Sequence, residues 1–120
     1  SAANAFVNNA SSPVNELLRF TSSLRYKKDV EELTAADWQQ LFQLRPVSFQ
    51  SLCPADDPEP RHFGLIAEEV HDIEPTLVHY MHDDDGELIP DGVQYEKCIP
   101  LLIAAFQQLT ARLDHLEARP

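Results

Sequence analysis

The end of the chain carries a regular pattern of large apolar residues. Six of them alternate at spacings of three and four residues, the a/d pattern of a heptad repeat: Ile99, Leu102, Phe106, Leu109, Leu113 and Leu116. The pattern predicts one long helix with an apolar seam, and Pro100 can be accommodated in the first turn of such a helix. A seam of just under three heptads is too short to hold an isolated coiled coil firmly, so it must act together with a globular part.

Two interpretations of this helix are open. Its seam could join copies of the chain, or it could be the apolar face of a helix that folds onto its own domain. Leu101, Ile103, Ala104 and Ala105 widen the apolar stripe. In the first interpretation these four residues contact the chain's own domain, while the seam contacts partner subunits.

The length and charge of the chain limit its class. A chain of 120 residues forms one domain with a modest core, in which we expect Trp38. Its formal net charge of −11 repels phosphate backbones, so we expect no nucleic-acid partner. No apolar run reaches the roughly 18–20 residues that span a bilayer, so we expect no membrane partner. Cys53 and Cys98 lie far apart in the sequence and form no Cys-x-x-Cys pair, and we interpret both as free thiols of a reducing compartment, with a disulfide between them as the alternative.

The first part of the chain has a boundary and a helix start. Residues 1–20 are rich in Ala, Asn and Ser and indicate a linker or the end of an upstream stalk, so the folded domain is predicted over residues 21–120. Thr34 followed by Asp37 has the spacing of a capping box, with Asp in place of Glu, and predicts the start of a helix. That helix should end before Pro46, because the residue preceding a proline avoids helical geometry.

The middle of the domain combines short strands with a helix. Residues 47–49 predict a strand, and the proline-rich residues 51–61 predict a surface loop. The apolar spacing of residues 63–73 predicts a second helix. Residues 77–81 and 88–95 predict a hairpin around an aspartate-rich turn. The sequence therefore predicts an α+β fold, a small mixed domain with a hairpin, two short helices and a long C-terminal helix.

Two groups of ionisable residues could be interpreted as chemical sites. His79 and His82 precede Asp83–Asp85, but this spacing on a strand places the histidines on opposite faces, and Asp-Asp-Asp-Gly lacks the ligand spacing of a calcium loop. We therefore expect a turn there, and no metal and no cofactor. Glu68 and Glu69 are adjacent on a predicted helix, where neighbouring side chains diverge, so we do not expect an acid–base pair.

A serine and a lysine near the start of the folded part form a candidate nucleophile and base. Ser22 stands five residues before Lys27, within a basic, polar segment that includes Arg25 and Lys28. A serine hydroxyl is a poor nucleophile until a base takes its proton, and a lysine can be that base as a free amine. Burial and neighbouring cations favour the free amine. Five residues is not a same-face helical spacing, so a bend or a neighbouring subunit must bring the two groups together.

Four blocks of sequence occur in a fixed order and carry a resemblance. They are SSLRYKKDV (22–30), LRPVSF (44–49), FGLIAEEV (63–70, with a proline soon after) and the segment 95–102 that leads into the leucine helix. They are similar to the motifs Ser-Asp-x-Arg-x-Lys-x-x-Ile, Leu-Arg-Pro-Val-x-Phe, Gly-x-Ile-Ala-Gln-Glu-Val and Tyr…Pro-Leu-Leu. The chain thus resembles, over residues 21–117, the peptidase S74 family. This family is the intramolecular chaperone and auto-processing domain of bacteriophage tailspikes, tail fibres and endosialidases.

The resemblance implies an assembly role. Such a domain forms a homotrimer through a helical bundle and helps an upstream β-structured stalk, fibre or spike of the same polypeptide to fold. It would belong to a virion tail precursor that assembles in the cytoplasm of the host bacterium. The alternatives are a structural trimerisation cap that is never released, and a monomeric binding domain.

The resemblance also implies a self-cleaving serine–lysine endopeptidase. Carried over to this chain, Ser22 is the nucleophile, Lys27 is the base, and the bond between Thr21 and Ser22 is cut. Ser23 stands where cleaving members carry an aspartate, which removes a carboxylate beside the nucleophile. His62 precedes the third block, where the resemblance suggests a functional histidine; a surface histidine at a helix start is the alternative. Ser23 and His62 are therefore auxiliary candidates.

Overall fold

The computed structural model describes residues 21–119. The chain divides into two compact units, Ser1–Glu32 and Leu33–Pro120, and each is described by itself. The prediction that residues 1–20 form a linker or the end of a stalk lies outside the described residues. In the first unit the described chain contains one turn of 3-10 helix, η1 (Leu24–Tyr26).

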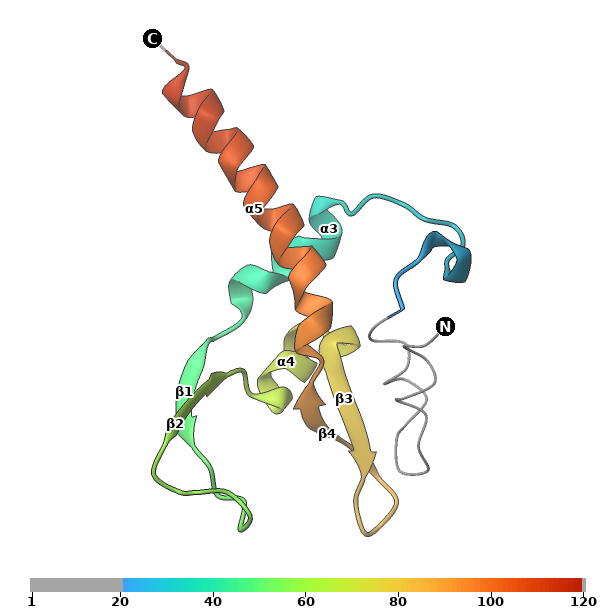
Figure 1. Cartoon of the computed structure of the whole chain (residues 1–120), viewed down its shortest axis with the longest axis vertical. Coiled ribbons are helices and arrows are strands. Elements are labelled where there is room, and N and C mark those ends of the chain that lie inside the picture. The colour runs from blue at the N-terminus through green and yellow to red at the C-terminus, as the bar shows by residue number, and fades with distance from the viewer. Residues whose placement is uncertain (1–20, 120) are drawn as a thin grey trace. The chain divides into compact units, whose positions relative to one another are not determined.

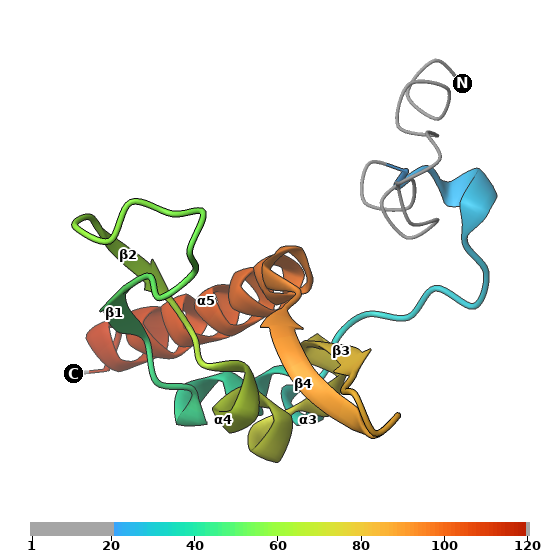
Figure 2. The same cartoon turned by 90° about the horizontal axis from the view of Figure 1, so that it is seen from below.

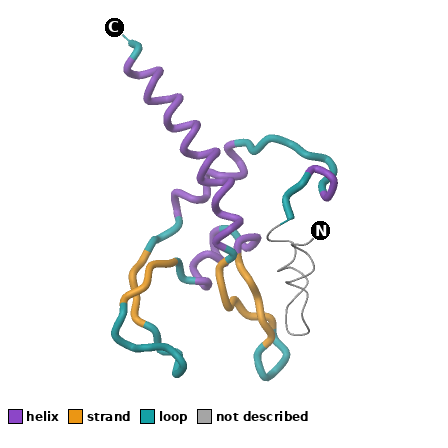
Figure 3. Tube along the Cα trace, in the orientation of Figure 1, coloured by secondary structure: helices purple, strands orange, loops and turns teal. Residues whose placement is uncertain are grey.

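The second unit combines helices with two antiparallel hairpins, which confirms the predicted α+β class. Its elements are α3 (Ala35–Trp38), the 3-10 helix η2 (Gln39–Gln43), β1 (Val47–Gln50), β2 (Arg61–Gly64), α4 (Ala67–Ile73), the 3-10 turn η3 (Pro75–Leu77), β3 (Val78–His82), β4 (Leu88–Val93) and α5 (Tyr95–Glu117). Figures 1 and 2 show α4 between the hairpins β1–β2 and β3–β4. The long helix α5 starts beside α4 and extends away from both hairpins (Figure 3).

The first helix of this unit begins and ends where the sequence predicts. The carboxylate of Asp37 accepts hydrogen bonds from the backbone N–H of Thr34 at 2.7 Å and from its hydroxyl at 3.2 Å. This confirms the capping arrangement at the start of α3. The helix tightens into η2 and gives way to extended backbone at Leu44, before Pro46. Trp38 is buried, with its ring edge-on to a neighbouring aromatic ring, as the prediction of a core position requires.

The prediction of a helix from residue 63 onward is wrong at its start. Phe63 and Gly64 belong to strand β2 and pair with Ser48 and Val47 of β1, and α4 begins only at Ala67. Strand backbone needs partners for its N–H and C=O groups, and the residues that follow the proline-rich loop provide them for β1. The pairing joins segments that are distant in sequence, so apolar spacing within residues 63–73 could not reveal it.

The second hairpin confirms the predicted strands and turn. Strands β3 and β4 pair from Val78 with Val93 to His82 with Leu88. One carboxylate oxygen of Asp83 accepts the backbone N–H groups of residues 85 and 87, both at 2.9 Å. Gly86 adopts a φ of 82°, a left-handed conformation that glycine reaches without steric cost. The aspartates therefore shape a turn. Across residues 21–119, no three His, Cys, Asp or Glu side chains come together to hold a metal ion.

The core lies where α4, the hairpin β3–β4 and the start of α5 meet. It is formed by Val70, Leu77, Val78 and Cys98. Gln94, just before α5, donates from its backbone N–H to the Leu77 carbonyl at 2.8 Å and from its side chain to the Val78 carbonyl at 3.0 Å. These contacts set the start of the helix close to the hairpin.

Three further features of the structure concern α5, the cysteines and the length of the helices. Helix α5 begins at Tyr95, so Pro100 lies in its second turn and the prediction of a first-turn position is wrong. Cys53 and Cys98 are free thiols, as predicted. None of the helices described for residues 21–119 combines the length and apolar character needed to cross a bilayer.

Candidate functional site

Ser22 and Lys27 lie in contact at the start of the described chain. The Nζ atom of Lys27 donates a hydrogen bond to Ser22 Oγ at 3.1 Å. The turn η1 between them makes this contact possible, since the backbone N–H of Lys27 donates to the Leu24 carbonyl at 3.0 Å and turns the chain back. The bend that the five-residue spacing requires is thus present within one chain.

The neighbours of this pair stabilise the turn. Ser23 is the N-cap of η1, and its hydroxyl accepts the backbone N–H of Arg25 at 3.4 Å. The guanidinium of Arg25 lies 4.8 Å from the centre of the Tyr26 ring and donates to its hydroxyl at 3.1 Å. Ser23 therefore has a structural function as a cap, one that an aspartate side chain at the same position could also fill.

The chemistry available to the pair depends on its surroundings. Both side chains are exposed in the single chain, and in their hydrogen bond the lysine is the donor. To activate the serine, the amine must instead accept the hydroxyl proton, which requires its neutral form. Removal from water favours that form of a lysine. The observed contact shows that the two atoms reach one another; the assignment of Ser22 and Lys27 as catalytic residues stays a prediction.

His62 lies in strand β2 of the second unit and not at a helix start. Its exposed ring packs against Phe49 of β1, with 5.5 Å between the ring centres. The expectation of a histidine at a helix start is therefore wrong about the element. A catalytic role for His62 remains a prediction, as it does for Ser23.

The apolar seam of α5 is open to solvent. All six seam residues are between 45% and 72% exposed in the single chain. The helix instead uses Cys98, Ala105 and the partly buried Leu101 to pack against its own domain. Ile103 was predicted to contact that domain as well, but this prediction is wrong, because its side chain is 52% exposed. The seam is thus not the face through which α5 folds onto its own chain.

Two contacts join the sequence blocks of the second unit. The guanidinium of Arg45 pairs with both carboxylate oxygens of Glu69, with its Nη2 atom 2.6 Å from Oε2 and its Nε atom 3.1 Å from Oε1. This hydrogen-bonded pair lowers the pKa of Glu69 and raises that of Arg45. Tyr95 of α5 accepts the backbone N–H of Leu65 through its hydroxyl oxygen at 2.9 Å. A Cβ atom on Gly64 would lie 2.6 Å from that oxygen, so glycine is the residue that fits there.

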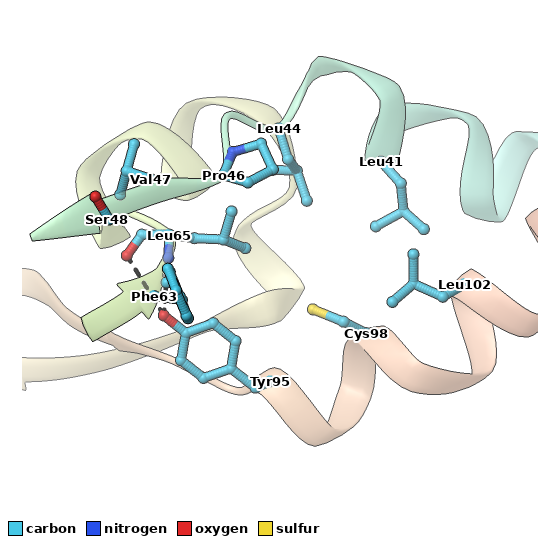
Figure 4. Close-up of a pocket in the computed structure, with 11 residues that line it drawn as sticks. Leu41, Leu44, Pro46, Val47, Ser48, Phe63, Leu65, Tyr95, Cys98 and Leu102 are labelled. Atoms are coloured by element: carbon cyan, nitrogen blue, oxygen red, sulfur yellow. Dashed lines mark hydrogen bonds between the residues drawn. The ribbon is translucent and has the colours of Figure 1, made fainter. Parts of the chain in front are cut away.

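An apolar groove of about 690 Å³ lies between η2, the hairpin β1–β2 and α5 (Figure 4). Its lining includes Leu41, Leu44, Leu65 and Leu102, with the Cys98 thiol directed into it. Burial, followed by the charge of a nearby carboxylate, raises the pKa of this thiol, which disfavours its reactive thiolate form. The sequence analysis missed the groove, because its lining comes from segments that meet only in the folded chain.

Part of the chain matches a known protein family. Residues 22–79 match the peptidase S74 family, described as chaperone of endosialidase. Residues 22–79 belong to the peptidase S74 family. The S74 segment begins at Ser22 and includes Lys27 together with the second and third sequence blocks. The description of the S74 family supports an intramolecular chaperone role. A comparison with curated proteins finds no match.

Proposed function

We propose that this chain is an intramolecular chaperone that assembles as a homotrimer. It would help an upstream fibre or spike β-structure of the same polypeptide to fold, and then release itself by cutting between Thr21 and Ser22. The observation that carries the proposal is the open apolar seam of α5 in a chain with a peptidase S74 segment.

The seam supports assembly because its own chain covers little of the end of α5. Every described residue after Ala105 is exposed, and a helical segment this short is marginal in water by itself. A parallel bundle would cover the seam and hold the three chains in one register. Threefold symmetry would place the three upstream chains in equivalent positions, where they could be aligned.

The contact between Ser22 and Lys27 supports the cleavage step. Ser22 Oγ attacks the carbonyl carbon of Thr21 and transfers its proton to the neutral amine of Lys27. The peptide C–N bond breaks, and the amine of Ser22 takes up the proton, which leaves an ester that water hydrolyses. Because burial favours the neutral lysine, covering this segment during assembly would couple cleavage to correct folding.

The proposed setting is consistent with the cysteines. A phage tail precursor assembles in the cytoplasm of its bacterial host, a compartment that keeps thiols reduced. Cys53 is exposed and Cys98 is buried, and both are free.

Mass spectrometry of the full chain tests the cleavage step. Incubation of the assembled protein should yield a fragment that begins at Ser22, and both Ser22→Ala and Lys27→Ala should abolish it. Lys97→Ala is the matched control and should still be cut, because it removes an exposed lysine of α5 but not the hydrogen bond to Ser22. An intact chain after long incubation of a trimer would contradict cleavage.

The second candidate is a trimerisation cap that is never released. Ser23 favours it, since the position beside the nucleophile carries a hydroxyl in place of a carboxylate. Light scattering tests assembly independently of cleavage. A monomer mass at micromolar concentration would contradict both trimeric candidates and favour a monomeric binding domain.

A further inference from the structure

Ile103 is an exposed apolar residue that the seam does not explain. With Ile99 at position a of a heptad, Ile103 occupies position e, beside the seam, and its side chain is 52% exposed. Cys98 occupies position g of the preceding heptad and lies on the other flank of the helix. Unlike Ile103, it is buried and lines the groove between η2, the hairpin β1–β2 and α5.

The groove and the seam form one continuous apolar surface. Leu102 is a seam residue and also lines the groove, so a helix that covers the seam passes the mouth of the groove. Figure 4 shows Leu41 and Leu102 facing one another across the groove, with the Sγ atom of Cys98 between the helix and the hairpin. The surface available to a partner is therefore wider than the six seam side chains.

The seam by itself offers too little area for a stable assembly. Six large side chains, each about half exposed, supply on the order of 600 Å² per chain. A specific and stable interface buries about 800 Å² on each partner, and in a trimer the area of each chain is divided between two neighbours. Additional apolar surface beside the seam is needed, and the groove provides it.

We propose that the groove receives Ile103 of a second copy of this chain. In a parallel bundle the g residue of one helix lies beside the e residue of the following heptad in its neighbour. Cys98 and Ile103 have these two positions. Each copy therefore gives one Ile103 and receives one, a head-to-tail contact that closes after three subunits. The inference rests on the proposed trimer, because it needs copies aligned in parallel along α5.

Disulfide trapping of the full chain tests this contact. The variant carries Cys53→Ser and Ile103→Cys, so that each chain has thiols only at positions 98 and 103. Within one helix these positions are about 7.5 Å apart along the axis, too far for a disulfide. Oxidised glutathione should therefore give bridges between copies, seen as a covalent trimer on a non-reducing gel and lost after reduction.

Two controls separate this inference from the proposed trimer. Cys53→Ser with Gln107→Cys places the new thiol at position b, on the outer side of α5, and should give no covalent trimer. Light scattering of each variant before oxidation measures assembly directly. A trimer that does not cross-link through position 103, or one that cross-links equally through position 107, would overturn the groove contact alone. A monomer would overturn both proposals.

A charged substitution gives a second measurement. Ile103→Asp should weaken association by at least about tenfold, because it places a carboxylate in an apolar site. Gln107→Asp adds the same charge outside the interface and should associate as the wild type does. Since both positions are exposed in the single chain, circular dichroism should show both variants folded. Unchanged association of Ile103→Asp would contradict the inference.

Discussion

The two halves of α5 carry the same apolar spacing but have different surroundings. Helix α5 packs against α3, η2 and η3, and the two residues that it buries, Cys98 and Ala105, both lie in the half from Tyr95 to Ala105. From Phe106 to Glu117 every residue is exposed, although the spacing of leucines continues unchanged. The difference shows that the pattern alone does not say which part of a helix its own chain will cover. The packed half contributes to the stability of the domain, while the seam, which runs along both halves, stays open for assembly.

The largest expected effect comes from the open half. Leu113→Asp should abolish the proposed trimer, with association weakened by at least about a hundredfold, since a charge would be buried among apolar seam residues. Light scattering should show the mass fall to that of one chain. The fold of the chain should persist, because Leu113 is exposed within it. Gln107→Asp is the control for added charge. A Leu113→Asp variant that stays trimeric would contradict a role of this half of α5 in assembly.

Substitutions in the core beneath the packed half should change the stability of the single chain. In the monomeric Leu113→Asp background, Leu77→Ala should lower the free energy of unfolding by about 2–4 kcal/mol, because Leu77 is buried beside Cys98. Leu116→Ala in the same background should change it by less than about 0.5 kcal/mol, because its side chain is already exposed. Urea titration measures both. Equal effects would mean that the end of α5 packs on its own chain.

The attachment of the packed half can be tested at Tyr95. Gly64→Ala should cost about 1–3 kcal/mol of unfolding free energy, because its new methyl group would lie 2.6 Å from the Tyr95 hydroxyl. Tyr95→Phe alone should cost about 0.5–1.5 kcal/mol, through loss of the hydrogen bond from Leu65. In the double variant the clash is relieved, so its loss of unfolding free energy should be smaller than the sum of the losses in the two single variants. Additive costs would contradict this account of Gly64.

The smallest effect concerns the ion pair between Arg45 and Glu69. The pair lowers the pKa of the Glu69 carboxyl below its ordinary value of 4.5. A lowered pKa in the folded state stabilises the fold above the ordinary value, and this contribution is lost as the pH falls through the folded pKa. Glu69→Gln should therefore lower Tm slightly near neutral pH and not in strong acid. High salt should reduce the difference, because the pair is exposed. A pH-independent difference would exclude the ion pair as its cause.

Local signals predicted the elements whose causes are local. Thr34 and Asp37 identified the start of α3, because a capping arrangement uses atoms three residues apart. The aspartates and Gly86 identified the β3–β4 turn for the same reason. Phe63 was misassigned because its strand partner lies across a long loop, and the start of α5 was placed too late because Gln94 bonds to a distant strand.

The candidate site also has features that local sequence revealed and features that it did not. The Ser22 and Lys27 pair was identified from the sequence because the two residues lie within one turn of chain, and the structure adds the 3.1 Å contact. The groove beside Cys98 had no sequence signal, since four separate elements line it. The resemblance of the sequence blocks identified the family without indicating that these blocks meet through Arg45, Glu69 and Tyr95.

The sequence by itself determined that the chain ends in a heptad pattern, that a serine stands five residues before a lysine, and that residues 22–79 have peptidase S74 motifs. These properties depend on spacing along the chain, which the sequence displays directly. Only the tertiary structure decided that Cys98 and Ala105 face the domain while Ile103 and the seam stay open. Apolar spacing marks every face that avoids water, but packing in three dimensions selects which of those faces the chain covers by itself.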